Sequence, residues 1–186
     1  MSLQRAIENL KEEMRKAGID AKTGLGNEMF LFSSTLAPVV NVDLLITNGS
    51  QILLSWRNDL HCGSGWHIPG GCIRFKETLE ERIQKTALSE IGTTVTHDNG
   101  PVKVFEIFSD YYRKGIQDQN ERAHFITLAY CCQIPEHWSI ESQKANPGDE
   151  GYLKWFDSLP DELLSVQDCY KTSWDEINKV LWRLNK

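Results

Sequence analysis

The sequence lacks the features that mark a membrane protein or a nucleic-acid binder. No apolar run approaches the roughly 20 residues that a membrane-spanning helix needs, and the first residues carry no signal-peptide core. The formal net charge at pH 7 is −6, and no run of Lys and Arg exceeds two residues. A general nucleic-acid or membrane-surface binder would need a basic footprint. We therefore expect neither partner.

Cysteine pairs with a recognisable spacing are also missing. The chain has five cysteines and no Cys-x-x-Cys pair, and an odd count without a framework spacing suggests a reducing cytoplasm. We therefore expect a cytoplasmic protein. One group of neighbouring residues could be imagined as a zinc set, but its spacing fits no standard site. Its members are His61, Cys62, His67 and Cys72.

Two regions follow from the patterning of the 186 residues. Hydrophobic residues make up 40% of the chain and charged residues 25%, an ordinary globular balance for one domain with a small extension. An apolar stripe predicts an amphipathic helix over residues 3–17, and a glycine-containing connector follows to residue 28. This helix could cover the core or contact a second subunit, which makes a homodimer one expectation. Residues 1–28 form the extension and residues 29–186 the main domain, beginning with a short strand at 29–32.

The main domain alternates predicted strands and helices. The runs 39–47 and 51–57 flank Asn48-Gly49, which is typical of a β-hairpin, and residues 58–65 read as a polar loop. Further strands are expected at 103–112, 123–134 and 152–156, a short helix from 159, and a final helix from Ser173. This order predicts an α+β fold, an αβα sandwich with a mixed sheet. Asp43, inside the first long strand, must either face solvent or be satisfied in a pocket.

The stretch from Gly70 to Gly92 predicts a loop, a helix and a second loop. Gly70 and Gly71 allow positive φ and a close backbone approach to a ligand. Thr78 and Glu81 have capping-box spacing, and Gly92 is placed to end the helix. The apolar stripe of this helix is Leu79, Ile83, Ala87 and Ile91.

This stretch resembles the Nudix box, in which a Gly and a Glu six residues later precede a helix that carries three carboxylates. Five positions of the pattern match: Gly71, Glu77, Ala87, Glu90 and Gly92. Lys85 replaces the Arg of the pattern, and Thr86 and Ser89 replace two of the helix carboxylates. The resemblance implies a Nudix hydrolase fold and a Mg²⁺ ion, with Mn²⁺ as a substitute, held by Gly70 and Glu90.

The missing carboxylates make the chain most similar to the GDP-mannose mannosyl hydrolase branch of the family. That branch has an Asp in the first long strand and an Arg ending the next, as at Asp43 and Arg57. Before the last strand it places a metal ligand and then a base, at the positions of Asp149 and Glu150. It also has an Arg directly after the Gly pair, where this chain has Cys72; Arg74 could take over the phosphate charge.

The resemblance therefore implies a Mg²⁺-dependent hydrolase of a nucleotide-sugar or related nucleoside diphosphate derivative, with water attacking the sugar carbon. Glu150 is the expected base, and Arg57, Arg74 and Lys85 neutralise the diphosphate. One alternative is a pyrophosphatase that attacks phosphorus with Glu77 or Glu150 as base. Another is a nucleotide-binding module that has lost catalysis. The sequence offers Phe108, Tyr111 and Tyr112 for stacking on a nucleobase, although aromatic residues in a strand more often belong to the core.

Overall fold

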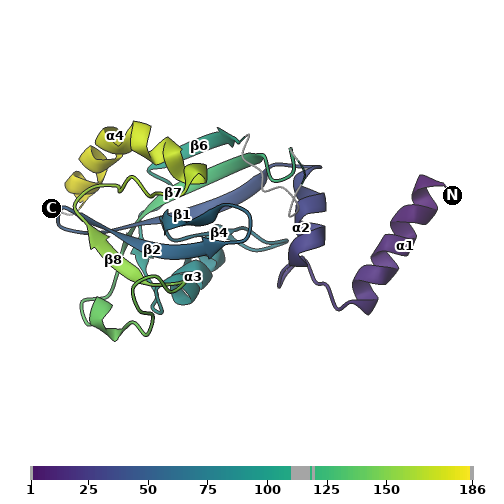
Figure 1. Cartoon of the computed structure of the whole chain (residues 1–186), viewed down its shortest axis with the longest axis horizontal. Coiled ribbons are helices and arrows are strands. Elements are labelled where there is room, and N and C mark those ends of the chain that lie inside the picture. The colour runs from purple at the N-terminus through teal and green to yellow at the C-terminus, as the bar shows by residue number, and fades with distance from the viewer. Residues whose placement is uncertain (1, 110–117, 119, 185–186) are drawn as a thin grey trace.

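The structure, a computed structural model, describes residues 2–109, 118 and 120–184. Four α-helices lie within these residues: α1 (Leu3–Lys16), α2 (Gly26–Ser34), α3 (Leu79–Glu90) and α4 (Asp168–Leu184). The strands are β1 (Val39–Asn48), β2 (Gln51–Asp59), β3 (Gly63–His67), β4 (Gly70–Cys72), β5 (Thr96–His97), β6 (Lys103–Phe108), β7 (His124–Gln133) and β8 (Leu153–Phe156). Figure 1 shows α3 and α4 on opposite sides of the sheet and α1 standing apart.

The described strands form one mixed sheet. Its main order is β3-β2-β1-β7-β5, with β4 paired to β1, β6 to β7 and β8 to β2. The β1–β7 pair is parallel and the other pairs are antiparallel. The expected αβα sandwich is confirmed.

Alternating side chains of β1 supply the two hydrophobic cores. Val42 and Leu44 pack in the core that α3 covers, whereas Leu45 packs in the core that α4 covers. A strand between two helical layers is buried on both faces, which explains its nearly unbroken apolar run. Asp43 lies between Val42 and Leu44 and therefore faces the α4 side.

Several expected elements differ from those observed. Residues 29–32 belong to helix α2 rather than to a strand, so this helix crosses the expected boundary between residues 28 and 29. Residues 58–65 are not a simple loop, because β2 runs to Asp59 and β3 returns from Gly63. No helix begins at residue 159: residues 159–164 are turns and extended chain, and a 3₁₀ turn follows at Ser165–Gln167. The last helix begins at Asp168, five residues before Ser173.

Two of the expected β elements are present. The first hairpin is present, with Thr47 opposite Ile52, and Gly49 has a φ of 62° in its two-residue turn. The expected strand at 103–112 is seen as β6, and its positions 110–112 lie outside the described residues. All five cysteines are free thiols. In the part of the chain that the structure describes, no helix is both long and apolar enough to cross a membrane.

Candidate functional site

The helix of the Nudix-like stretch is fixed at both ends by local signals. The Glu81 amide donates to Thr78 Oγ1 at 3.2 Å, and the Thr78 amide donates to a Glu81 carboxylate oxygen at 2.8 Å, which completes the capping box. Gly92 follows the helix with a φ of 78°. The predicted apolar stripe is correct apart from Leu79, which is 41% exposed. The helix thus sets Glu90 at its last turn, beside the sheet.

The glycine pair permits close packing rather than positive φ. Both residues lie in β4, and neither is in the left-handed region. A Cβ at Gly70 would lie 2.3 Å from Asp43 Oδ1, and a Cβ at Gly71 would lie 2.6 Å from Thr86 Oγ1. Side chains at either position would therefore push β4 away from β1 or from α3. Close approach was expected here, but the observed neighbours are parts of the protein.

Glu77 is held by cations on its own segment. Arg82 donates to both of its carboxylate oxygens, at 2.7 and 2.8 Å, and Lys85 donates at 3.0 Å. The Arg74 amide donates a further hydrogen bond at 2.9 Å. Burial opposes the charged form, but these donors outweigh it and lower the pKa of Glu77 to about 2. A carboxylate so strongly stabilised is a poor proton acceptor, and this ion pair orders the loop before α3.

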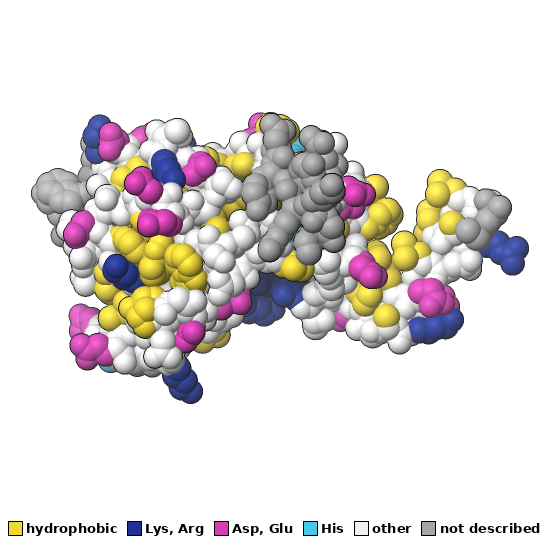
Figure 2. Space-filling view, in the orientation of Figure 1, with side chains coloured by type: hydrophobic (Ala, Val, Ile, Leu, Met, Phe, Trp, Pro, Cys, Tyr) yellow, Lys and Arg dark blue, Asp and Glu magenta, His cyan; other side chains and the backbone are white. Residues whose placement is uncertain are grey.

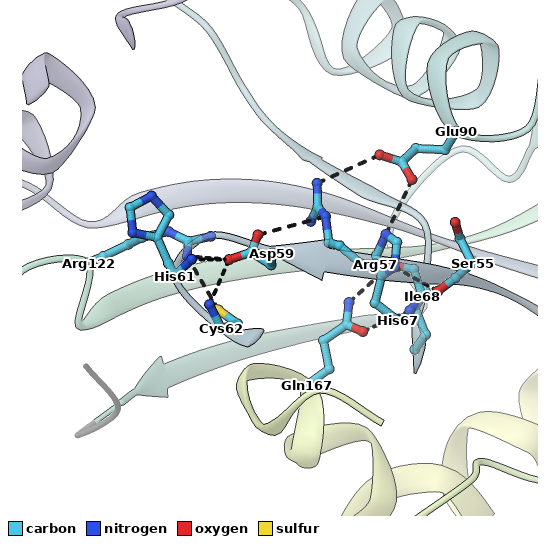
Figure 3. Close-up of polar contacts among 10 residues, drawn as sticks. All are labelled: Ser55, Arg57, Asp59, His61, Cys62, His67, Ile68, Glu90, Arg122 and Gln167. Carbon is cyan, nitrogen blue, oxygen red and sulfur yellow. Dashed lines mark hydrogen bonds and ion pairs between the residues drawn. The ribbon is translucent and has the colours of Figure 1, made fainter. Parts of the chain in front are cut away.

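Glu90 lies beside one imidazole and one guanidinium (Figure 3). His67 Nε2 is 3.2 Å and Arg57 Nη2 is 3.8 Å from its carboxylate oxygens. Burial opposes the negative charge, but the two neighbours outweigh it and hold the pKa of Glu90 below its ordinary value. On its other side, the Arg57 guanidinium lies 3.8 Å from Asp59. Glu90 is therefore an ionised carboxylate at the border of two hollows.

Two hollows meet at Glu90 and Arg57. The larger, about 810 Å³, is lined by α2, the connector before it, β4 and α3, and it includes Arg74. The smaller, about 240 Å³, brings Glu150 together with Glu90, Arg57 and His67. Segments far apart in the sequence thus supply one carboxylate from α3, one from the loop before β8, and cations from β2 and from the segment that follows β4.

Asp43 is buried, so the pocket alternative is correct. Tyr170 donates to its Oδ2 at 2.9 Å and Gln167 donates at 3.2 Å. Gln167 also pairs with the backbone of Ile68, accepting from its amide at 2.7 Å and donating to its carbonyl at 3.1 Å. Burial raises the pKa of Asp43 to about 6, although these hydrogen bonds partly oppose the rise. Asp43 lines a third hollow, of about 160 Å³, together with Arg57.

The remaining expected site residues are dispersed. Asp149 Oδ2 accepts from the amide and the side chain of Asn146 at 2.9 and 3.1 Å, so this carboxylate is engaged in its own turn. Lys85 is 57% exposed and paired with Glu77. Phe108 is 72% exposed and stacks on His124. Tyr111 and Tyr112 lie outside the described residues.

Sequence reasoning missed two functional candidates. His67 was considered only in the zinc set of residues 61–72, whose spacing fits no standard site, and was not connected with Glu90. Arg122 precedes β7 and lies 3.7 Å from Asp59, stacked over Phe30 and Phe125. Nothing local in the sequence relates Arg122 to this site, since Asp59 and Phe30 lie in β2 and α2, far from it in the sequence.

The residues present fit one divalent cation held partly by a substrate. Among the described residues, no three His, Cys, Asp or Glu side chains gather in a metal-binding group. Mg²⁺ nevertheless needs only one or two carboxylates when substrate phosphates and water complete its shell. Glu90 supplies an ionised carboxylate, and the carbonyl of Gly70 is the second candidate ligand, from β4 on the wall of the same 810 Å³ hollow.

Comparison with known proteins places the chain among Nudix structures. No family model matches it. The low-salt glycan biosynthesis protein Agl8 of Haloferax volcanii is 34% identical over 93 residues, which span 50% of this chain and 57% of that protein.

Three solved structures resemble the chain over most of its length. A Nudix-family hydrolase from Clostridium perfringens gives a TM-score of 0.53 at 17% identity, over 78% of this chain and 99% of that one. A MutT Nudix hydrolase from Burkholderia pseudomallei gives a TM-score of 0.52 at 20% identity, over 72% of this chain and 95% of that one. A UDP-X diphosphatase gives a TM-score of 0.54 at 19% identity, over 98% of this chain and 81% of that one. The main domain of this chain therefore has the Nudix hydrolase fold.

Proposed function

We propose that the chain is a metal-dependent Nudix hydrolase acting on a nucleotide-sugar or a related nucleoside diphosphate derivative. The main support for this proposal is that Glu90, Arg57 and Glu150 line adjoining hollows. In addition, Thr86 and Ser89 occupy positions where the Nudix pattern has carboxylates. The names of two similar proteins agree with this substrate class: one takes part in glycan biosynthesis and the other is a UDP-X diphosphatase.

In this proposal the 810 Å³ hollow takes the nucleoside diphosphate. Arg57 and Arg74 both line it and would pair with phosphate oxygens. Lys85 forms an ion pair with Glu77 at the surface, so it helps to order the loop before α3. The polar hollow beside Asp43 and Arg57 suits the hydroxyl groups of a sugar. Asp43 also positions β4 through Gln167 and Ile68.

Gly70 and Glu90 would hold the cation, Mg²⁺ or Mn²⁺. When bound, it neutralises charge that develops on the leaving diphosphate. Arg57 and Arg74 share that task. Glu150 would take a proton from the attacking water, because it lines the same small hollow as Glu90. Asp149, first expected as a metal ligand, shapes the loop that presents Glu150.

Attack at the sugar carbon follows from the shortage of carboxylates on α3. A multi-metal clamp that stabilises attack at phosphorus needs several ligands, and Thr86 and Ser89 cannot supply them. Substitution at carbon requires only that the diphosphate leave with its charge neutralised. A base on the opposite face of the sugar from the diphosphate would invert the anomeric centre.

Hydrolysis in ¹⁸O-labelled water tests this proposal. A panel of nucleoside diphosphate sugars is incubated with the chain and Mg²⁺ or Mn²⁺. Mass spectrometry then shows which of the two products contains ¹⁸O. Label in the free sugar, with a nucleoside diphosphate released, is the expected result. Label in a phosphate, with a sugar phosphate released, would assign the pyrophosphatase alternative. Tight nucleotide binding without turnover would assign the binding module.

A further inference from the structure

His67 is a buried side chain that the proposed reaction leaves unused. It lies at the end of β3 and is 3% exposed. Its Nδ1 is 2.9 Å from the carbonyl oxygen of Ser55, which can only accept, so Nδ1 carries a hydrogen and donates it. In the neutral ring the lone pair is then on Nε2. Among the described residues Nε2 has no hydrogen-bond partner.

The free lone pair of Nε2 is directed toward Glu90. The ring nitrogen approaches Glu90 Oε2 to 3.2 Å, without hydrogen-bond geometry (Figure 3). A buried nitrogen acceptor against an ionised carboxylate is unfavourable unless a proton or a metal cation lies between them. Arg57 Nη2 lies 3.8 Å from the other carboxylate oxygen, Oε1.

We propose that His67 Nε2 is a ligand of the divalent cation, taking one of the places that the missing helix carboxylates leave. A metal-bound histidine usually donates its other ring hydrogen to a carbonyl or carboxylate, which fixes the tautomer and the ring orientation; Ser55 provides that carbonyl here. The inference rests on the proposed metal site at Glu90 and deepens it.

The spacing of the two ligand atoms agrees with this assignment. Neighbouring ligands on a tetrahedral zinc ion with bonds of about 2.0–2.1 Å lie about 3.3–3.4 Å apart. On an octahedral Mg²⁺ ion with bonds of about 2.0–2.1 Å they lie about 2.8–3.0 Å apart. The observed 3.2 Å falls between these values. His67 and Glu90 could therefore bind one cation with only small movements.

A nitrogen ligand changes which metal the site prefers. Mg²⁺ favours oxygen ligands, whereas imidazole suits later first-row divalent metals, and affinity for a nitrogen-containing site rises from Mn²⁺ onward. The site should therefore bind Mn²⁺ at least about tenfold more tightly than Mg²⁺, and His67→Leu should remove most of this preference. His137→Gln is the matched control, because His137 is exposed and distant in the sequence from the site.

The test uses Mn²⁺ alone with the full chain. Electron spin-echo measurements on the Mn²⁺-loaded protein, with and without ¹⁵N-labelled histidine, should show a directly bound histidine nitrogen in the wild type and in His137→Gln. His67→Leu should lose that signal and bind Mn²⁺ about 10- to 100-fold more weakly, as titration calorimetry measures. Circular dichroism checks that the variant is folded.

Two results would overturn the inference: Mn²⁺ bound to the wild type without histidine nitrogen coupling, or no Mn²⁺ binding at millimolar concentration. Because the wild-type measurement decides by itself, an unfolded His67→Leu variant does not weaken the test. The labelled-water experiment separates this inference from the proposed function. Turnover without nitrogen coupling would refute only the assignment of His67 as a metal ligand. Nitrogen coupling without turnover would refute only the proposed hydrolase activity.

Discussion

Arg82 donates two hydrogen bonds to the carboxylate of Glu77, one to each oxygen. Both side chains are buried, with 9% and 4% of their surfaces exposed. Breaking such a pair leaves an uncompensated charge in the interior, which costs about 3–5 kcal/mol. Glu77→Gln should therefore lower the free energy of unfolding at pH 7 by about 3 kcal/mol, as measured by urea denaturation.

The same variant has a characteristic pH dependence. The pKa of Glu77 is about 2 in the folded chain and about 4.3 when unfolded. Since the folded value is the lower one, the stabilisation is complete above about pH 4.3 and is lost as the pH falls toward 2. The difference between wild type and Glu77→Gln should shrink over that window. A difference that stays constant across this window would argue against the ion pair.

The region around α3 illustrates what the sequence could predict. The start and end of this helix follow from Thr78, Glu81 and Gly92, whose signals act within a few residues. The two faces of β1 were also foreseeable as a run of apolar side chains. Leu79 was misassigned because the first turn of a helix need not face the core even when the periodicity includes it.

Longer-range relationships could not be predicted from one sequence. The hydrogen-bond donors of Asp43 lie 124 and 127 residues further along the chain, and no local pattern connects them. The role of His67 depends on the Ser55 carbonyl, a backbone atom that sequence patterns do not show. Helix α2 was mistaken for a strand because its short apolar segment fits either periodicity.

Glu90 should be essential for metal-dependent turnover. It is the one carboxylate at the three helix positions of the Nudix pattern, and it lies against the 810 Å³ hollow. Glu90→Gln should reduce turnover by at least about 100-fold, the scale of losing a ligand. Steady-state rates across a Mg²⁺ and Mn²⁺ titration measure this. Glu80→Gln, on the exposed face of the same helix, should retain wild-type rates, and a normal rate for Glu90→Gln would remove Glu90 from the site.

Glu150 and Asp149 should behave differently despite being neighbours. Glu150 lines the hollow beside Glu90, whereas Asp149 is hydrogen-bonded to Asn146. Glu150→Gln should lower kcat by about 10²- to 10⁴-fold with a smaller effect on KM, as loss of a general base does. Asp149→Asn should change kcat much less. If Glu77→Gln is inactive while still folded and Glu150→Gln is active, the pyrophosphatase reading replaces ours.

Asp43 should make the fold less stable as the pH rises through the mildly acidic range. Its pKa is about 6 when folded and about 3.9 when unfolded, so the folded chain binds more protons between these values. A raised folded pKa gives stability that is present below about pH 3.9 and is lost as the pH rises through 6. Relative to Asp43→Asn, the wild type should lose about 2–3 kcal/mol between pH 4 and 7. Parallel pH curves would refute this, and Asp161→Asn, at an exposed position, serves as the control.

The first helix should be dispensable for the stability of the main domain. All 14 residues of α1 are described and none is buried. Its apolar side chains lie along an open surface (Figure 2), with Leu3 77% and Ile7 44% exposed. Deleting residues 2–17 should therefore change Tm by less than about 2 °C at low protein concentration, since no core contact is lost.

A homodimer that covers α1 would give a different result. Binding a second copy stabilises the folded state by mass action, so Tm of the full chain would rise with protein concentration. The mass from light scattering would then fall by half on deletion of α1. Differential scanning fluorimetry over a hundredfold range of concentration, together with the scattering measurement, distinguishes the two outcomes. A large fall in Tm in a monomeric sample would contradict the exposed position of α1, because only lost contacts within one chain could cause it.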